Sequence, residues 1–340
     1  MKLFIYEHIT SGALIDEPLP TSLAREGNDM LVAIVQDLIQ LSNIELIILR
    51  DARLEPLSEL VNDSLHHIDT IHDAATFHKH YHDALNHADM VLAIAPETDG
   101  ILNQVQQQVL DSNTRLLASK TMAIQICGDK YQCHQQLTAH DFLSPKTIKA
   151  NEWASKPFNS PSGFIIKPQD GAGCIDTFLL QNRESLESWL LSHPDLIDKM
   201  IIQAYIDGEV ISLSVLSDNT ESRVLAINQQ HIRFDNEKVS FLGSTVNGVN
   251  ESEFSLAQAD EISSKIHQAI PGLWGFIGID LIIHQDKAFV MDINPRLTTS
   301  YIGLGQSLNA NPTQLLFSMM EKGLSALPKD FQRQAVEVML

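Results

Sequence analysis

Three side chains with oxygen ligands interrupt an apolar stretch near the end of the chain. Asp280 lies in the apolar run 278–283, and Asp292 and Asn294 lie in the run 288–294. Both runs are rich in Ile, Val and Phe and are joined by a short polar turn, which predicts a buried β-hairpin. A buried carboxylate is unfavourable unless a cation compensates it, and oxygen ligands suit a hard cation such as Mg²⁺. The hairpin therefore predicts a metal site.

The metal prediction sets a condition on the hairpin turn. Asp292 and Asn294 are two residues apart on one strand, so they face the same side. Asp280 can join them only if the turn has an odd number of residues or a bulge shifts the register. We therefore predict a three-residue turn, 285–287, or a bulge nearby. The alternative is a surface hairpin with solvated acids, which the apolar neighbours disfavour.

A lysine and a glycine-bearing loop in the middle of the chain predict an anion site. Lys167 ends the apolar run 163–167, Pro168 stops that strand, and Gly171 and Gly173 follow. Glycines let backbone amides approach an anion closely, so a phosphate is the ligand that we expect. The loop lacks the GxxxxGK[ST] pattern of a P-loop, and alone it also fits an ordinary glycine turn.

The combination of cations and oxygen ligands is more specific than either part. Lys130 and Lys167 are two ammonium groups in an acidic chain, and Arg296 directly follows the metal-ligand pattern. Lysines on phosphate oxygens, a divalent ion and an arginine at the developing charge are what phosphoryl transfer requires. The apolar strand 201–206 could hold a flat base such as adenine. Lys130 and Arg296 also fit surface ion pairs, so the prediction depends on their joint occurrence.

The charge of the chain argues against nucleic acid as a partner. The 23 Lys and Arg residues and the 43 Asp and Glu residues give a formal net charge of −20, which repels phosphate backbones and anionic membranes. No apolar run reaches the length of a membrane span, and the N-terminus has no signal-peptide pattern. We therefore expect a cytoplasmic protein. Its three cysteines form no CxxC pair, so we expect reduced thiols.

The first third of the chain alternates between strands and helices. Strands are predicted for four apolar runs, 3–7, 45–50, 89–96 and 114–118. Helices between them predict a parallel sheet with crossover connections, an α/β fold. Ligands of such sheets gather beyond the carboxyl ends of the strands, so Glu7, Ser11 and Gly12 are candidates for substrate contact. A plain connecting loop is an equally good interpretation.

The rest of the chain reads as mixed α+β. Strands are predicted at 163–168, 199–206, 210–216, 223–228 and 239–242, and helices at 185–191 and 257–270. We divide the chain into three predicted domains, 1–118, 119–200 and 201–340. The histidine-rich segment 66–87 is interpreted as a solvated helix face rather than a zinc site, because no Cys or well-spaced carboxylate completes a ligand set.

In this order the motifs resemble the ATP-grasp superfamily, over nearly the whole chain. Within it, the segments 7–12, 167–174 and 292–304 look like the branch of tyramine:L-glutamate ligases, which act in methanofuran and methylofuran biosynthesis. The resemblance implies a Rossmann-like preATP-grasp domain at the N-terminus. A small lobe acting as a lid and a large lobe carrying the metal site would follow it.

The resemblance also implies roles for individual residues. ATP phosphates would be bound by Lys130 and Lys167 under a lid carrying Gly171 and Gly173, and adenine would meet Gln203 and the backbone around Tyr205 and Ile206. Two Mg²⁺ or Mn²⁺ ions would be held by Asp280, Asp292 and Asn294. The catalytic residues would be Lys167 and Arg296, the latter facing the transferring phosphoryl or acyl phosphate, with Ser300 as a further substrate contact.

Two positions depart from the common ATP-grasp pattern. The hinge position that is often acidic is Gln203 here, and the second hinge acid is Glu209, which the resemblance implies as a further cofactor contact. Val210 stands where many relatives carry the ribose-binding glutamate, which argues against a ribose contact by Glu209. The middle metal ligand is Asp292 where glutamate is commoner, so its shorter arm would bind one ion rather than bridge two.

The implied reaction is ATP-dependent amide formation through an acyl phosphate. The resemblance suggests that the γ-carboxylate of L-glutamate is joined to tyramine or a tyrosine-like amine, so the partners would be a small amino acid and an amine. Two alternatives remain, a ligase for another acid and amine and a non-catalytic ATP-binding sensor or scaffold. The oligomeric state is left open, with a homodimer as one possibility.

Overall fold

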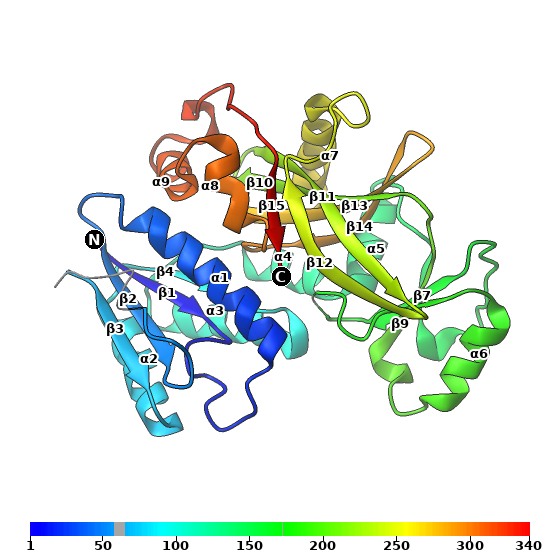
Figure 1. Cartoon of the computed structure of the whole chain (residues 1–340), viewed down its shortest axis with the longest axis horizontal. Coiled ribbons are helices and arrows are strands. Elements are labelled where there is room, and N and C mark those ends of the chain that lie inside the picture. The colour runs from blue at the N-terminus through cyan, green and yellow to red at the C-terminus, as the bar shows by residue number, and fades with distance from the viewer. Residues whose placement is uncertain (58–64, 172) are drawn as a thin grey trace.

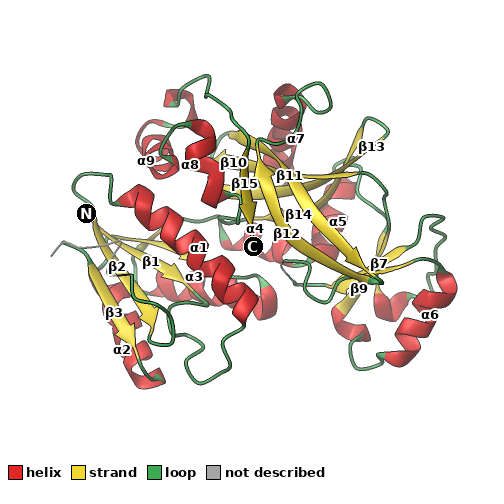
Figure 2. Ribbon diagram, viewed as in Figure 1, coloured by secondary structure: helices red, strands yellow, loops and turns green. Residues whose placement is uncertain are grey.

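The computed structural model describes residues 1–57, 65–171 and 173–340. Ala172, in the predicted anion-binding loop, lies outside this range. Figures 1 and 2 show two β-sheets side by side, one built by the N-terminal third of the chain and one by the remainder. None of the helices within the described ranges has both the length and the apolar character needed to cross a membrane.

Five parallel strands form the first sheet, in the order β3-β2-β1-β4-β5. The strands are β1 (Lys2–Glu7), β2 (Glu45–Asp51), β3 (His67–Ile71), β4 (Met90–Ile94) and β5 (Arg115–Leu116). Helix α1 (Thr21–Leu38) buries its apolar side with one face of this sheet, and α2 (Ala74–His87) and α3 (Ile101–Asp111) pack with the other. The predicted parallel α/β part is thus confirmed. Strand β3 was not predicted, because only Ile71 in it is fully buried.

The second sheet has ten strands, in the order β14-β13-β10-β11-β12-β8-β7-β9-β6, with β15 paired to β12. They are β6 (Thr147–Lys149), β7 (Phe164–Pro168), β8 (Phe178–Leu180), β9 (Met200–Ala204), β10 (Glu209–Ser217), β11 (Ser222–Asp235), β12 (Lys238–Val246), β13 (Gly275–His284), β14 (Lys287–Asn294) and β15 (Val336–Met339). All of these pairs are antiparallel. The mixed α+β character predicted for this part is confirmed.

Further helices follow α3 in the described part of the chain. They are α4 (Thr121–Gly128), α5 (Lys130–Ala139), α6 (Arg183–Ser192), α7 (Leu256–Ala269), α8 (Tyr301–Leu308) and α9 (Pro312–Lys322), and 3-10 turns lie at Thr98–Gly100, between β4 and α3, and at Ala150–Glu152, Ile197–Lys199 and Leu324–Ala326. The three-domain division stays a prediction. Strand β9 pairs with β6 and β7, so we would place it with the middle domain rather than after residue 200.

A bulge gives the β13–β14 hairpin the register that the metal prediction requires. The predicted three-residue turn is wrong, because the strands are joined by Gln285 and Asp286 alone, both with positive φ (49° and 60°) as a two-residue turn of this kind needs. The register shifts after Asp280, which lies directly opposite Asp292. The extra residue on β14 turns both carboxylates to the same side of the sheet, so the alternative prediction of a bulge is confirmed.

The C-terminal helices connect the two sheets. Residues of α8 and α9 share one buried apolar cluster with α1 and the first sheet, and Figure 1 shows both helices above α1. The Tyr301 hydroxyl donates to the Asp37 carboxylate at 2.6 Å, and the Asn311 amide donates to the Asp37 carbonyl at 2.8 Å. These contacts fix α1 against the part of the chain that carries the predicted metal site.

Acid should destabilise the protein through His8, at the end of β1. Its Nδ1 accepts a hydrogen bond from the Tyr6 hydroxyl at 2.8 Å, and burial lowers the pKa of His8 from 6.5 to about 4. Between these values the unfolded chain binds more protons than the folded one, so stability falls as the pH falls through this window. We expect His8 to account for a loss of about 2 kcal/mol, allowing for its partial exposure.

Urea unfolding between pH 7 and pH 4.5 checks this expectation. His8→Gln should flatten the pH dependence, whereas the matched change at the exposed His78 should leave it unchanged. If the free energy of unfolding depended on pH in the same way for both variants, the role of His8 would be contradicted.

Candidate active site

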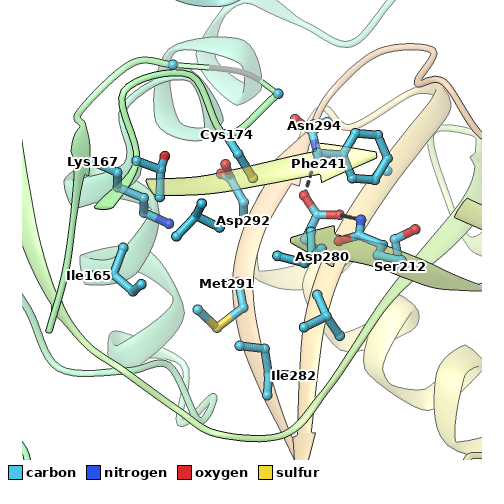
Figure 3. Close-up of a pocket in the computed structure, with 18 of the residues that line it drawn as sticks. Ile165, Lys167, Cys174, Ser212, Phe241, Asp280, Ile282, Met291, Asp292 and Asn294 are labelled. Atoms are coloured by element: carbon cyan, nitrogen blue, oxygen red, sulfur yellow. Dashed lines mark hydrogen bonds between the residues drawn. The ribbon is translucent and has the colours of Figure 1, made fainter. Parts of the chain in front are cut away.

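A cavity of about 370 Å³ collects most of the predicted site residues. Figure 3 shows part of its wall, with side chains from β7, β10, β12, β13 and β14 pointing into the same space. Twelve of the sixteen predicted residues line it, namely Lys130, Lys167, Gly171, Gly173, Gln203, Tyr205, Ile206, Asp280, Asp292, Asn294, Arg296 and Ser300. Segments up to 170 residues apart along the chain (130 to 300) therefore meet at one place.

Asp280 and Asp292 lie directly opposite each other on β13 and β14, and both line this cavity. Asp280 accepts hydrogen bonds from the amides of Gln230 at 2.8 Å and Asn294 at 3.0 Å (Figure 3). Burial and, next, the negative charge of Asp292 raise the pKa of Asp280 to about 6. Two carboxylates held this close in a buried place attract a cation, and the Asn294 carbonyl oxygen completes an all-oxygen set.

The described residues supply only part of the ligand set that a divalent ion needs. Within the described ranges no group of three or more His, Cys, Asp or Glu side chains could hold a metal. A cation here would therefore depend on Asp280, Asp292, the Asn294 carbonyl and oxygens supplied from outside the protein. That requirement matches Mg²⁺, which is commonly bound by one or two carboxylates together with phosphate oxygens.

The two lysines of the cavity differ in their partners. The Lys130 ammonium forms an ion pair with Asp292 at 2.8 Å and donates to the Gly171 carbonyl at 2.6 Å. Burial acts to lower the pKa of Lys130, but the charge and hydrogen bond of Asp292, together with the charge of Glu97, outweigh it, so the pKa is raised. For Lys167, burial is the larger effect and lowers the pKa. Its ammonium has no hydrogen bond or ion pair with any described residue, so it is available to an anion.

Arg296 is held in place by an acid from the first sheet. Its Nε and Nη2 each donate to one oxygen of Glu97 at 2.9 Å, and Nη1 donates to the Leu297 carbonyl at 3.2 Å. Glu97 follows β4, at the carboxyl end of a parallel strand, and both side chains are nearly buried. A guanidinium has five N–H groups, so two remain for a ligand. Sequence reasoning missed Glu97, although its place beyond β4 was a usable signal.

The glycine-bearing loop closes against the first sheet. Gly173 has a φ of 64°, which few residues other than glycine adopt readily. The Asp170 carboxylate accepts a hydrogen bond from the Asp99 amide at 2.9 Å, so the loop contacts the segment that carries Glu97. Cys174 also lines the cavity, and burial raises the pKa of its thiol to about 11. This thiol is therefore a neutral part of the wall at physiological pH.

An apolar slot forms another part of the cavity wall. Ile165, Ile282 and Met291 line it on the same side of the view in Figure 3, and Tyr205 and Ile206 line the same cavity. Gln203 is almost fully buried, and its amide nitrogen donates to the Thr147 hydroxyl at 3.0 Å. Its Oε1 has no hydrogen-bond partner among the described residues. A flat heteroaromatic group with an N–H edge would suit this slot.

Three predicted substrate contacts lie away from the cavity. Glu7 is 3% exposed and accepts hydrogen bonds from the Thr10 amide at 2.7 Å and the Thr10 hydroxyl at 2.6 Å. Its carboxylate packs beneath Gly27 of α1, where a Cβ would come within 2.6 Å. The Ser11 hydroxyl donates to the His8 carbonyl at 3.1 Å, and Gly12 packs on Ile71. The loop satisfies its own polar groups, so the structure supports the connector interpretation.

The fourth predicted contact, Glu209, also faces away. Val210 and Ser212 of β10 line the cavity, and alternation along a strand turns Glu209 to the opposite side, where Ile211 enters the core. Glu209, predicted as a cofactor contact, is thus not among the residues that line the cavity. By contrast, Ser300 does line the cavity, and its hydroxyl lies 2.9 Å from the Ser214 hydroxyl.

Replacing Glu97 by glutamine should affect both stability and activity. The change leaves the buried Arg296 without a counter-charge, so we expect a loss of about 3 kcal/mol in unfolding free energy. Because Arg296 would also lose its fixed orientation, any turnover should fall about 10²-fold. Denaturant unfolding and steady-state kinetics check this. The control is Glu45→Gln, which breaks an exposed pair with Lys2 and should change stability by less than about 1 kcal/mol.

Comparison with known proteins agrees with this arrangement. Residues 127–300 match the ATP-grasp domain family, and residues 44–124 match the pre ATP-grasp 3 domain. A tyramine–L-glutamate ligase from Methanocaldococcus fervens is 28% identical over 246 residues, which is 69% of this chain and 70% of that protein. In structure, an ATP-grasp superfamily protein from Archaeoglobus fulgidus superposes with a TM-score of 0.69 at 21% identity, covering 94% and 88% of the two chains.

An L-amino acid ligase from Bacillus licheniformis has the same fold, with a TM-score of 0.63 at 14% identity over 94% of this chain and 74% of that one. The matched ATP-grasp region contains both lysines, the acidic hairpin, Arg296 and Ser300, which line the cavity. The chain therefore belongs to the ATP-grasp family, with a pre-ATP-grasp region preceding its ATP-grasp domain.

Proposed function

We infer that the protein is an ATP-dependent carboxylate–amine ligase that forms an amide through an acyl phosphate. The observation that carries this proposal is the ammonium of Lys167, which has no partner among the described residues and lines the same cavity as Asp280 and Asp292. In a chain with a net charge of −20, such an ammonium favours a phosphate ligand. The family membership and the ligases among the relatives support the same reaction class.

Each group would have a separate task in this reaction. Lys130 and Lys167 would bind ATP phosphates, and the two free N–H groups of Arg296 would stabilise charge on the transferring phosphoryl group. The apolar slot with Gln203, Tyr205 and Ile206 would take adenine. The substrate carboxylate would attack the γ-phosphate, and an amine would then displace phosphate from the acyl phosphate. The protein would contribute positioning and charge neutralisation.

Magnesium or manganese would supply charge neutralisation on the phosphates. Asp280, Asp292 and Asn294 would hold it, and we propose two ions by analogy with the family pattern. The contact between Asp170 and Asp99 supports a lid role for the glycine-bearing loop. Such a lid would keep water from the acyl phosphate, which would otherwise hydrolyse.

For the substrates we propose the γ-carboxylate of L-glutamate and tyramine or a tyrosine-like amine. This choice is supported by the tyramine–L-glutamate ligases among the relatives. The protein would then serve a cofactor pathway of the methanofuran or methylofuran type, in the cytoplasm. Small molecules would be its partners, and a homodimer is an assembly that we propose for testing by light scattering.

An ADP-release assay with panels of amino acids and amines tests the function. With ATP and Mg²⁺, glutamate plus tyramine should release ADP and give one amide product, identified by mass spectrometry. Release with a different pair would keep the ligase class and replace the substrates. No release with any pair would overturn the proposal and favour a non-catalytic ATP sensor.

A further inference from the structure

Glu26 brings a carboxylate into the cavity from the first sheet's side. It lies on α1, one turn before Met30, and both side chains line the cavity. Burial raises the pKa of Glu26, although Arg296 and the Ser22 hydroxyl act in the opposite direction. No lysine or arginine among the described residues forms an ion pair with it. Nothing in the proposed ATP chemistry uses this acid.

The other charges of the cavity leave Glu26 without a cationic partner. Arg296 is already neutralised by Glu97 through two hydrogen bonds of 2.9 Å. Lys130 is paired with Asp292 at 2.8 Å. Lys167 is influenced by Asp292 and Asp280 rather than by Glu26. A half-buried carboxylate that forms no ion pair with a described residue is the arrangement expected where a ligand supplies the positive charge.

The position of Glu26 relates it to the reacting end of the nucleotide. A Cβ placed on Gly173 would lie 3.9 Å from its Oε1, so the carboxylate borders the glycine-bearing loop. Glu26 and Arg296 line the same cavity, and the charge of each affects the pKa of the other. An amine that approaches an acyl phosphate beside Arg296 would therefore meet this carboxylate in the same cavity, with Met30 as an apolar neighbour.

We propose that Glu26 binds the ammonium group of the amine substrate and takes its proton before the amine attacks. This proposal rests on the ligase function given above. The step transfers one proton from R–NH₃⁺ to the Glu26 carboxylate and leaves R–NH₂. The free amine then forms the C–N bond as the bond between the acyl carbon and the phosphate oxygen breaks. The departing phosphate takes the second amine proton, and Glu26 later returns its proton to water.

Hydroxylamine provides a direct test, because it is largely unprotonated at neutral pH and needs no base before it attacks an acyl phosphate. Wild type and Glu26→Gln would be compared in two reactions with ATP, Mg²⁺ and the acid substrate, hydroxamate formation with hydroxylamine and amide formation with the amine. Amide formation by the variant should fall about 10²-fold or more, while its hydroxamate formation should persist. Glu17→Gln, the same change at an exposed site before α1, is the control for both.

Two results would overturn the proposal. If both reactions of Glu26→Gln fall together while thermal unfolding shows an intact fold, Glu26 serves the acid or the nucleotide instead. If neither falls, the carboxylate has no role in either step. Failure of the wild type to form hydroxamate or ADP with any acid would instead reject the ligase function itself, so the two failures are distinguishable.

Discussion

Asp292→Asn should lower the rate of ATP-dependent amide formation by about 10³-fold, the size expected when a charge that stabilises the transition state is lost. Asp292 faces Asp280 across the hairpin and holds the Lys130 ammonium at 2.8 Å. Its neutral analogue would weaken cation binding and release Lys130. The fold should persist, because the Lys130 ammonium keeps its hydrogen bond to the Gly171 carbonyl. We expect the free energy of unfolding to change by at most about 2 kcal/mol.

The measurement combines steady-state kinetics, Mn²⁺ binding in the presence of an ATP analogue, and thermal unfolding. Asp286→Asn, in the turn of the same hairpin, is the matched control and should behave as wild type. If the Asp292 variant turned over at the wild-type rate, the acidic pair would not be part of the reacting centre.

Lys167→Met should lower kcat/KM for ATP strongly and yet stabilise the protein. Because Lys167 has no partner among the described residues and burial lowers its pKa, its charge is unfavourable for folding in the absence of a ligand. We expect a gain of about 1 kcal/mol in unfolding free energy, together with a loss of about 10³-fold in kcat/KM for ATP.

Lys130→Met provides the contrast. It removes a paired ammonium and leaves Asp292 beside Asp280 without compensation, so it should destabilise the protein by about 3 kcal/mol. Denaturant unfolding without nucleotide separates the two variants, and ATP should raise the melting temperature of wild type but not of Lys167→Met. Equal destabilisation by the two changes would contradict the assignment of Lys167 as a free ammonium.

The acidic hairpin was predictable because its evidence is local. Apolar periodicity, a short turn and the interruption by Asp280 and Asp292 all lie within 17 residues (278 to 294). The pattern did not show how Asp280 and Asp292 come to lie on the same face of the sheet. Strict alternation allows either an odd turn or a bulge, and the two φ-positive residues Gln285 and Asp286 favour the compact turn with a bulge elsewhere.

The contacts that the sequence did not reveal join distant segments. Glu97 and Arg296 are 199 residues apart, and no periodicity in either segment indicates their pairing. Glu26 lies on α1, whose apolar periodicity predicts which side of the helix is buried. The same periodicity does not predict which residues Glu26 lies close to. Glu7 shows the opposite case. Its place at the carboxyl end of a parallel strand predicted a contact with substrate, but its carboxylate accepts hydrogen bonds from the nearby Thr10 instead.

The pairing of Glu97 with Arg296 limits how this enzyme could be recombined with others. A chimera that takes its first third from another ligase would bury Arg296 without a counter-ion unless the donor segment also carries an acid after its fourth strand. The same graft would replace Glu26, so a foreign N-terminal segment would change both the carboxylate that we propose for the amine and the placement of Arg296. Hybrid sequences could therefore be selected, before expression, for an acidic residue at the positions of both Glu26 and Glu97.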